Sequence, residues 1–499
     1  MKITIIDYFE KTVRNFPDKI ALKDIDTELT YESLKEASQA VGTFIAAENI
    51  LQRPVAILMK RSVSLPVAMM GVLYSSNFYV VLDADSPAQR LKKIIATLDP
   101  AALIYEKSTE HLLTEIRTDA KAYSFETISS AKETDREILC EIRNLMTSES
   151  PAYALFTSGS TGEPKGALLT HGNVISYISW STECFNITDK TVFGSQTPLY
   201  FSMSVSDLFS TMFTGSTYVL IPKSYFAFPG KLVSYMNKHK INTIYWVPSA
   251  LGIIVKMDLF KYMLPEYLDK ILFAGETMPV KYLNYYIKYL PDAFYANLFG
   301  PTETTDICTY YVVDRTFENQ ENLPIGKACA NCELFIFDSE LYVKGPFVAK
   351  GYYNNPEATE KAFVQNPLHN NYIDIVYKTG DLVEGKPYEE LSYIGRKDFQ
   401  IKHMGYRIEP GEIENALNTV NNQILTVCLH DADNDTLILA YESKEELDNK
   451  LLNYAEEKLP AYMKPEIYRR FDSFPVNQNG KTDRKRIKEI VLNEINGGK

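Results

Sequence analysis

Residues 155–171, LFTSGSTGEPKGALLTH, combine hydroxyl side chains, glycines and one lysine in a short run. Glycines let a backbone turn tightly and bring its N–H groups close to an anion. The hydroxyls add hydrogen-bond donors and Lys165 adds a positive charge, so this composition suits a triphosphate. The run is not a Walker A loop, because glycine follows Lys165 where that loop needs serine or threonine. The alternative is a polar surface loop between two strands.

Two further polar turns follow apolar segments, FAGETMP at 273–279 and ANLFGPTETTD at 296–306. In the second, Gly300 and a proline force a turn, and Thr302 and Glu303 come directly after it. A carboxylate beside threonine hydroxyls suits Mg²⁺ bound to phosphate oxygens, since Mg²⁺ prefers hard oxygen ligands. Taken alone, such a segment is more often a polar turn than a site.

Two motifs nearer the C-terminus place charged residues at predicted turns. In YKTGDLV, 377–383, Asp381 ends a predicted strand, and its carboxylate can accept hydrogen bonds from ribose hydroxyls. In NQNGKTDRK, 477–485, Gly480 allows a turn that projects Lys481. A fixed ammonium near a phosphate would stabilise the negative charge that develops in a transition state. For each motif alone, the alternative is a plain turn residue or a solvated lysine.

The elements that must position these residues alternate between apolar strands and segments with a helical pattern. A helix is predicted over 63–75, directly after the first of these strands. This alternation predicts a mainly parallel sheet covered by helices, which is an α/β fold. The predicted strands are 54–59, 78–83, 101–105, 216–222, 242–248 and 270–275.

A domain boundary is predicted near 395–399. After it, Pro410 begins a predicted helix, because proline suits the first helical position. Strands are predicted at 424–430 and 435–443, followed by an amphipathic helix over 444–459 with regularly placed leucines. These elements fit a compact α+β domain of about 100 residues.

Composition limits the possible functions. The chain has 499 residues and a net charge of −12, which argues against a general nucleic-acid binder. It carries neither a signal peptide nor an apolar run of the ~18 residues that a membrane helix needs, so a cytoplasmic protein with no membrane insertion is predicted. The six cysteines include one CxxC, 329–332, without a second pair. Reduced thiols are therefore expected rather than a zinc site, which needs about four ligands.

Taken together, these motifs resemble, in type and order, the signature segments of the adenylate-forming (ANL) superfamily, which contains amino-acid adenylation domains, acyl-CoA ligases and luciferases. The segment GRKDFQIKHMGYRIEPGEIE, 395–414, is similar to the crossover segment of amino-acid adenylation domains. The resemblance extends from LTYESL at 29–34 to Lys485. Within the superfamily, the chain resembles stand-alone amino-acid adenylation domains of the non-ribosomal peptide synthetase and D-alanine–carrier protein ligase type.

The resemblance implies a fold and a reaction. A large α/β core over 1–396, with mainly parallel sheets flanked by helices, would bind ATP and the acid. A small, mobile α+β domain over 397–499 would carry the catalytic lysine and rotate about Asp398 between half-reactions. With ATP and Mg²⁺, the enzyme would form an acyl-adenylate and pass the acyl group to the phosphopantetheine thiol of a carrier protein. Because the chain ends shortly after Lys485, the carrier is expected to be a separate protein and the enzyme to stand alone.

The resemblance also implies roles for single residues. Lys481, Thr302 and Glu303 would be catalytic, and Glu303 would bind Mg²⁺. Lys402 and Gly405 would line the pantetheine channel. The implied ATP contacts are Thr157, Ser158, Gly159, Ser160, Thr161, Lys165, Gly275, Glu276, Asn297, Phe299, Gly300, Asp381, Arg396 and Lys481.

Among these ATP contacts, four would hold the nucleoside. Asn297 would contact the edge of the adenine, and Phe299 would stack on it. Asp381 and Arg396 would bind the ribose.

The acyl-substrate segment departs from the family pattern. Adenylation domains for α-amino acids carry an aspartate directly after a phenylalanine, in a segment like FDxSVxE, and it pairs with the substrate ammonium. Here the segment is PLYFSMSVSDLF, and Ser202 follows Phe201. A serine cannot supply the charge that offsets the desolvation of an ammonium. The residues placed in the substrate pocket are Phe201, Ser202, Met203, Ser206, Tyr245, Leu272, Ala274, Leu298, Asp306 and Ile307.

Asp306 stands where the family usually has an apolar pocket residue, so a carboxylate is lost at one position and gained at another. This shift predicts a non-standard amino acid with its amine at a β or more distal carbon. One alternative is an uncharged aryl or hydroxy acid, with Asp306 pointing out of the pocket or capping a helix.

Two other functional classes compete with carrier-directed adenylation. An acyl- or aryl-CoA ligase would use CoA as acceptor, but such enzymes often have histidine where Phe201 stands, and their crossover segment differs. A non-catalytic member would serve for binding or regulation. The presence of Lys165, Glu303, Asp381 and Lys481 speaks against that alternative.

Overall fold

The computed structural model describes residues 3–130, 134–157, 163–319, 321–397, 400–418, 425–432, 434–447, 457–476 and 482–497. The chain forms two compact units. The first comprises Met1–Ala84, Ile95–Phe156 and Lys165–Lys397, and the second comprises Asp85–Ile94, Thr157–Pro164 and Asp398–Lys499. The predicted division at 396/397 and the predicted mobility of the small domain stay predictions.

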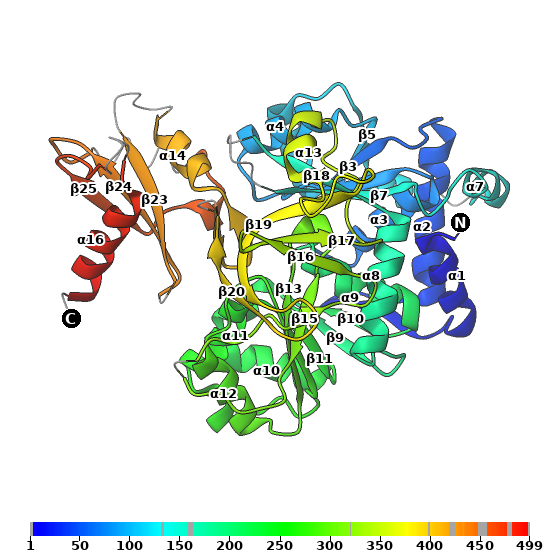
Figure 1. Cartoon of the computed structure of the whole chain (residues 1–499). Coiled ribbons are helices and arrows are strands. Elements are labelled where there is room, and N and C mark those ends of the chain that lie inside the picture. The colour runs from blue at the N-terminus through cyan, green and yellow to red at the C-terminus, as the bar shows by residue number, and fades with distance from the viewer. Residues whose placement is uncertain are drawn as a thin grey trace. The chain divides into compact units, whose positions relative to one another are not determined.

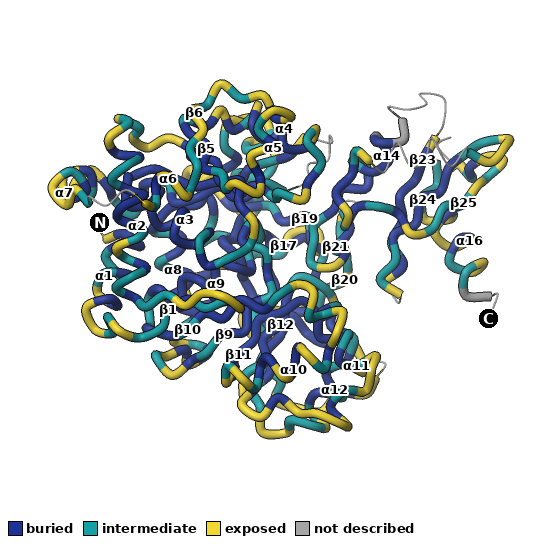
Figure 2. The backbone as a smooth tube through the Cα atoms, turned by 180° about the vertical axis from the view of Figure 1, so that it is seen from behind, coloured by how far each residue is buried: buried dark blue, intermediate teal, exposed yellow. Residues whose placement is uncertain are grey.

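A nine-stranded sheet in the described part of the first unit carries most of the candidate site. Its strand order is β15-β14-β13-β12-β11-β9-β10-β1-β2. The run from β13 to β1 is parallel, and the strands beyond it on either side pair antiparallel. The central strands are short, apolar and buried on both faces, as parallel strands under helices must be (Figure 2). The bounds are β1 (Ile20–Lys23), β2 (Glu28–Thr30), β9 (Val192–Ser195), β10 (Thr217–Leu220), β11 (Thr243–Trp246), β12 (Lys270–Phe273), β13 (Phe294–Phe299), β14 (Thr309–Val312) and β15 (Lys327–Ala328).

A second sheet of this unit has the described strand order β6-β5-β3-β4-β7-β8. Its strands from β6 to β7 are parallel, which confirms the predicted mainly parallel architecture. The bounds are β3 (Pro54–Leu58), β4 (Phe78–Val81), β5 (Ala102–Tyr105), β6 (Lys121–Ser124), β7 (Pro151–Thr157) and β8 (Lys165–Thr170).

A third sheet of the first unit is antiparallel. The strand that Asp381 was predicted to end is its central strand β19, which continues to Gly385. The long strand β19 pairs with three others, so it organises this sheet. The bounds are β16 (Glu333–Phe337), β17 (Glu340–Lys344), β18 (Phe363–Gln365), β19 (Ile375–Gly385) and β20 (Leu391–Arg396).

Helices cover the sheets, and two of them bear directly on the site. Helix α8 starts at a capping box in which Thr170 and Asn173 satisfy each other's backbone N–H groups. Helix α9 ends at Gly215, whose φ of 81° allows the left-handed cap. The two helices pack against each other, and α1 contacts both (Figure 1). The bounds are α1 (Ile5–Asn15), α2 (Tyr31–Ala47), α3 (Ser64–Tyr74), α4 (Ala88–Leu98), α5 (Glu110–Ile116), α6 (Phe125–Ser129), α7 (Arg136–Arg143), α8 (His171–Cys184), α9 (Met203–Thr214), α10 (Pro229–Lys238), α11 (Pro248–Lys256), α12 (Val280–Tyr289) and α13 (Pro356–Ala362).

The second unit is built around a three-stranded sheet with a core on each face. Alternate residues of β23 and β24 enter opposite cores, because side chains alternate across a strand. Cys428 lies in the core that also holds Ile401 and Ile408 of the β21–β22 hairpin, whereas Val427 lies in the core that α16 covers. The bounds are β21 (Ile401–His403), β22 (Tyr406–Ile408), α14 (Pro410–Asn418), β23 (Thr426–Asp431), β24 (Thr436–Glu442), β25 (Ile467–Phe471) and α16 (Arg484–Gly497).

Most of the amphipathic helix predicted over 444–459 lies outside the described residues. Its described flanks, 444–447 and 457–459, are not helical, and 448–456 lie outside the described residues. Leu447 and Leu459 nevertheless pack into the core that contains Cys428.

Candidate active site

Glu303 lies in a buried turn directly after β13. It belongs to the short 3₁₀ helix η4 (Thr302–Thr304), and its side chain is fully buried. The Tyr352 hydroxyl donates to Glu303 Oε1 over 2.5 Å, and the Lys165 ammonium lies 5.1 Å from the centroid of the same tyrosine ring. The backbone N–H of Ala349 donates to the carbonyl oxygen of Glu303 over 2.8 Å. Tyr352 therefore brings together two residues, Lys165 and Glu303, that the sequence placed at the phosphates.

The turn around η4 is tight, and Gly300 is required for it. A Cβ at Gly300 would lie 2.5 Å from the carbonyl oxygen of Asp306 and 2.5 Å from Cα of Ile307. Thr305 has a φ of 66°, which is unusual for a β-branched residue, and its hydroxyl donates to the buried carbonyl of Phe347 over 2.7 Å. The chain thus folds back on itself so that Glu303 and Asp306 are both buried within four residues.

Asp381 and Arg396 form a buried ion pair across two neighbouring strands. They are directly opposed in the register of β19 and β20, and Arg396 Nη1 donates to Asp381 Oδ1 over 3.0 Å. Arg396 Nη1 also lies 3.0 Å from the carbonyl oxygen of Thr379, and both side chains of the pair are almost fully buried. The two residues assigned to the ribose are therefore adjacent, and the guanidinium compensates the carboxylate charge.

Other predicted ATP contacts take structural partners in this ligand-free protein. Glu276 accepts hydrogen bonds from the backbone N–H of Ser249, over 2.8 Å, and from its hydroxyl, over 3.0 Å, at the start of α11. The side-chain amide of Asn297 donates to the carbonyl oxygen of Pro324 over 2.8 Å. The Phe299 ring lies 5.7 Å from that of Tyr393. Gly275, beside Glu276, has a φ of 88°.

A buried carboxyl cluster lies at Asp306, which is 1 % exposed. Its Oδ2 accepts hydrogen bonds from the hydroxyl of Tyr177 on α8, over 2.7 Å, and from that of Tyr245 on β11, over 3.0 Å. Burial raises the pKa of Asp306 to about 7, although hydrogen bonds from Tyr177, Tyr245 and Ser202 act in the opposite direction. Asp306 therefore points into the protein and not into solvent. Ser202, at the place of the family's aspartate, contacts it.

A second buried carboxyl group lies in the same neighbourhood. Asp207 on α9 is fully buried, and burial together with the nearby Asp306 raises the pKa of Asp207 well above its usual value. The Arg61 guanidinium acts in the opposite direction, but it also donates to the backbone carbonyls of Thr197, Ile221 and Ser195. Two acids thus share this part of the core.

The other predicted pocket residues surround these acids on neighbouring elements. Tyr245 and Leu272 are paired in the register of β11 and β12, and Leu298 lies on the adjacent β13. Phe201 and Ser202 are partly exposed just before α9. The remaining pocket residues are buried: Met203, Ser206, Tyr245, Leu272, Ala274, Leu298 and Ile307.

Several predicted site residues fall outside the described residues: Ser158, Gly159, Ser160, Thr161, Asp398 and Lys481. Thr157 ends β7 directly before the first of them. Lys402 and Gly405 lie in the β21–β22 hairpin of the second unit, where Gly405 has a φ of 79°.

The sequence patterns missed three residues of the site: Tyr177, Tyr352 and Asp207. Tyr177 and Asp207 lie in helices whose sequences resemble ordinary buried helices, so their contacts with distant residues left no periodic signal. Tyr352 follows GPFVAKG, a glycine-containing stretch that was not singled out. A polar aromatic beside such a turn is the one signal that could have drawn attention to it.

Comparison with known proteins identifies the family. The model of the AMP-binding enzyme family matches residues 9–353. The chain belongs to this family of AMP-binding enzymes. It is therefore an adenylate-forming ligase that uses ATP to activate a carboxylic acid, as the motifs predicted.

Relatives of this AMP-binding enzyme include much longer proteins. It is 30 % identical over 503 residues to surfactin synthase subunit 1 of Bacillus subtilis, matching 97 % of the chain but 14 % of that protein. It is 29 % identical over 497 residues to gramicidin S synthase 2 of Brevibacillus brevis, matching 96 % of the chain and 11 % of that protein. The chain thus spans a small part of the length of these relatives.

Solved structures confirm the predicted fold class. The Vibrio cholerae adenylation domain AlmE, in complex with glycyl-adenosine-5'-phosphate, superimposes with a TM-score of 0.85 at 20 % identity, covering 98 % of this chain and 97 % of that one. The o-succinylbenzoate CoA synthetase of Bacillus subtilis gives 0.82 at 22 % identity, covering 97 % and 98 %. The fused adenylation–carrier di-domain NpsA-ThdA of Klebsiella oxytoca gives 0.80 at 20 % identity, covering 94 % of each chain. Within the part of the chain that the structure describes, no helix is both long and apolar enough to cross a membrane.

Proposed function

We propose that this enzyme activates a small amino acid whose amine lies at a β or more distal carbon, and that it passes the acyl group to the phosphopantetheine thiol of a separate carrier protein. The observation that carries the substrate proposal is Asp306. It is a buried carboxyl group, and the hydroxyls of Tyr177 and Tyr245 orient it beside the position of the family's usual aspartate.

The chemistry of this cluster favours an ammonium group. A substrate cation beside Asp306 would stabilise its ionised form, which burial alone disfavours. A charge-assisted hydrogen bond of this kind contributes about 1.5–3 kcal/mol, more than a neutral one. An uncharged acid would leave the carboxyl without that compensation.

The nucleotide would occupy the other half of the site. Glu303, a hard oxygen ligand, would hold Mg²⁺ against the phosphates, and the ion would neutralise their charge. Lys165 and the hydroxyl-rich residues 157–161 would bind the phosphates, and Asn297 and Phe299 would contact the adenine. Asp381, oriented by Arg396, would accept hydrogen bonds from the ribose.

Two half-reactions follow from these roles. The substrate carboxylate attacks the α-phosphorus of ATP and expels pyrophosphate, which gives the acyl-adenylate. Lys481 would stabilise the negative charge of this step. A rotation of the small domain about Asp398 would then admit the thiol past Lys402 and Gly405. The thiol attacks the acyl carbon, forms the thioester and releases AMP.

The carrier-bound thiol is the proposed acceptor because the crossover segment 395–414 is similar to that of amino-acid adenylation domains. Structural relatives include adenylation domains studied together with carrier domains, NpsA-ThdA and PA1221. The second candidate acceptor is CoA, the acceptor named for the o-succinylbenzoate CoA synthetase that shares this fold.

A substrate screen by pyrophosphate exchange tests the acid. We expect exchange with β- or ω-amino acids to exceed exchange with α-amino, hydroxy and aryl acids. If α-amino acids or uncharged acids give the highest kcat/KM, the substrate proposal is wrong, although adenylation itself would stand.

A second assay tests the acceptor. The preferred acid is offered with ATP and either CoA or a phosphopantetheinylated carrier protein, and thioester is measured by mass spectrometry. We expect the carrier to be loaded and CoA to remain unacylated. Acylated CoA with an unloaded carrier would favour the CoA ligase.

A further inference from the structure

A cluster of metal-binding side chains lies in the second unit, separate from the residues assigned to ATP and the acid. His403, His430 and Asp435 each offer one ligand atom, and these atoms lie within 4.8 Å of one another. His403 Nδ1 is 2.9 Å from Asp435 Oδ1, and His430 Nε2 is 3.0 Å from the same oxygen. The two imidazole rings are 5.6 Å apart at an angle of 72°, so neither ring stacks on the other.

The local fold explains why these residues meet. His430 lies two residues after Cys428 on β23, so strand alternation puts it on the face that packs against the β21–β22 hairpin. His403 is the last residue of β21 and is 2 % exposed. Asp435 lies in the turn between β23 and β24 with a φ of 51°, and this turn directs it toward both rings.

We propose that His403, His430 and Asp435 form a binding site for a divalent transition-metal ion, of which Zn²⁺ is the best fit. Two imidazole nitrogens and a carboxylate are a donor set that Zn²⁺ accepts, whereas Mg²⁺ and Ca²⁺ prefer all-oxygen sites. Tetrahedral bonds of about 2.0–2.1 Å put ligand atoms about 3.3 Å apart. The two nitrogen–oxygen separations, 2.9 Å and 3.0 Å, need only a few tenths of an ångström of expansion, and the two ring nitrogens lie within 4.8 Å of each other.

A neighbouring carboxylate supports this assignment. Metal-bound histidines usually donate their other N–H group to a carboxylate, which fixes the ring. With a metal on Nδ1, His403 carries its proton on Nε2, and that atom faces Glu466 Oε1 at 3.8 Å. The other oxygen of Glu466 accepts the backbone N–H of Leu437 over 2.6 Å, which holds the carboxylate in place.

The ion would strengthen a connection between two elements that the His403–Asp435 contact already links. The β21–β22 hairpin has only two strands, and such hairpins are marginally stable on their own. A metal bridging His403 to β23 and its turn would fix this hairpin, which also carries Lys402 and Gly405. Three protein ligands leave the fourth position of Zn²⁺ to water, and the proposed role of the ion is to hold the hairpin. The inference does not depend on the proposed substrate or acceptor.

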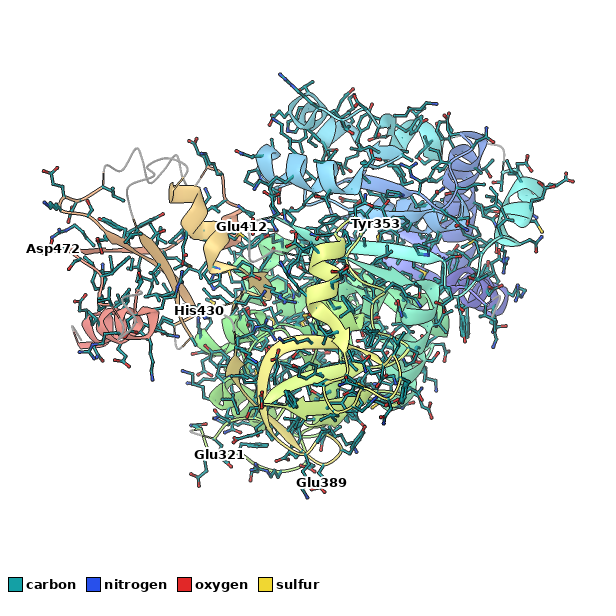
Figure 3. The ribbon with its side chains drawn as sticks, turned by 45° about the horizontal axis from the view of Figure 1, so that its top comes forward. Glu321, Tyr353, Glu389, Glu412, His430 and Asp472 are labelled. Carbon is teal, nitrogen blue, oxygen red and sulfur yellow. The ribbon has the colours of Figure 1, made fainter. Side chains whose placement is uncertain are left out.

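Calorimetric titration of the full-length, tag-free chain with Zn²⁺ tests the proposal. The protein is first treated with chelator, and the buffer holds excess Mg²⁺ to fill all-oxygen sites. We expect one equivalent of Zn²⁺ to bind in the micromolar range or tighter and to raise the midpoint of thermal unfolding. His430, labelled in Figure 3, comes from β23, and the variant His430→Gln removes one ligand while keeping a polar side chain.

The variants Asp435→Asn and Glu466→Gln extend the test. Asparagine tolerates the left-handed backbone at 435, so the fold is expected to survive the loss of the carboxylate. Glu466→Gln should weaken binding about 10–100-fold, and the loss of either ligand by more. The matched control is His111→Gln, because His111 is an exposed histidine of the first unit. The His111→Gln protein should bind Zn²⁺ as the unmodified protein does. The absence of one-equivalent binding in the unmodified chain, or undiminished binding in both His430→Gln and Asp435→Asn, would overturn the site.

Discussion

The nucleotide side and the acyl side of the first unit compensate their carboxylates in opposite ways. At the proposed nucleotide side, Arg396 lies 3.0 Å from Asp381. The Tyr352 hydroxyl donates to Glu303, and the Lys165 ammonium lies over the ring of Tyr352. At the acyl side, Asp306 accepts hydrogen bonds from neutral hydroxyls, and its pKa is near 7. Under the proposed function, the protein would supply its own cations where it binds phosphates and would rely on the substrate for the cation where it binds the acid.

The largest expected effect concerns the nucleotide half-reaction. Lys481→Ala should reduce adenylate formation about 10²–10³-fold, corresponding to roughly 3–4 kcal/mol of transition-state stabilisation. Transfer from pre-formed acyl-adenylate to the thiol should remain close to normal. Pyrophosphate exchange and single-turnover transfer measure the two steps separately. Near-normal exchange would show that Lys481 has another role.

Removing the Glu303 carboxylate, which is proposed to hold Mg²⁺ at the phosphates, should slow adenylation of every acid substrate to the same extent. Loss of an outer-shell partner of a metal costs about 10–100-fold, so Glu303→Gln should cost at least about 100-fold in kcat. The KM of the acid should stay unchanged, because Glu303 belongs to the nucleotide side. The measurement is exchange at saturating acid with varied Mg²⁺. A loss of activity with amino-acid substrates alone would contradict the division of the site into a nucleotide side and an acyl side.

Asp306→Asn should act only on the acyl side. Because the ammonium loses a charge-assisted bond of about 1.5–3 kcal/mol, the KM for the amino substrate should rise ten-fold or more, with little change for ATP. The matched control is Asp207→Asn. Asp207 is a second buried acid whose pKa burial raises well above its usual value, but the proposed ammonium contact is with Asp306, so replacement of Asp207 should change KM little. Equal effects of the two variants would remove the special role of Asp306.

The acyl side should also depend on pH. The pKa of Asp306 is raised from 3.8 to about 7, so its carboxylate form becomes dominant only above that pH. For the amino substrate, kcat/KM should therefore rise with pH up to about 7 and then level off, with up to about a ten-fold change per pH unit below it. The Asp306→Asn enzyme should lack this rise.

The same titration should change the stability of the ligand-free protein. A raised pKa means that the folded state holds a proton that the unfolded state releases, so the stabilising contribution is present below about pH 4 and is lost as pH rises to about 7. The thermal midpoint of the unmodified protein, relative to Asp306→Asn, should fall across that range. Parallel pH profiles of the two proteins would contradict the assignment of this pKa.

The smallest effect is expected from Tyr245→Phe. The Tyr245 hydroxyl donates to Asp306 over 3.0 Å and so stabilises the charged carboxylate. Loss of this hydroxyl should raise the pKa of Asp306 further and shift the pH profile of kcat/KM upward by about one pH unit. At pH 7, KM for the amino substrate should rise a few-fold. Tyr286→Phe, which removes a buried hydroxyl that donates to Leu251, is the matched control. A profile shifted equally in both variants would indicate a general loss of packing.

Much of the parallel core could be predicted from sequence because each strand there is a short apolar run ending in a turn. The segments 54–59 and 270–275 were predicted as strands and form β3 and β12. The antiparallel sheet around β19 largely escaped prediction, since its edges are short and irregular. Its long-range pairings, such as β17 with β19, have no local signature.

The same distinction applies to the site. Glu303 and Asp381 were singled out because a glycine stands close before each of them in the sequence. Tyr177 was missed because a tyrosine in an apolar helix has the appearance of a core residue, and its partner Asp306 is 129 positions away. The charge shift from position 202 to 306 was visible in sequence, but the contact of Ser202 with Asp306 required the fold.

The turn that contains Thr305 has a consequence for how specificity can diverge. Gly300, Thr305 and the hydrogen bond to Phe347 fix the backbone just before residue 306, whichever side chain stands there. A single replacement at 306 can therefore exchange an acid for an apolar group without altering the path of the chain. The direction of the side chain at 306 is thus set by the backbone and its chemistry by the residue type. If the proposed substrate contact holds, position 306 is where directed evolution of the accepted acid would begin.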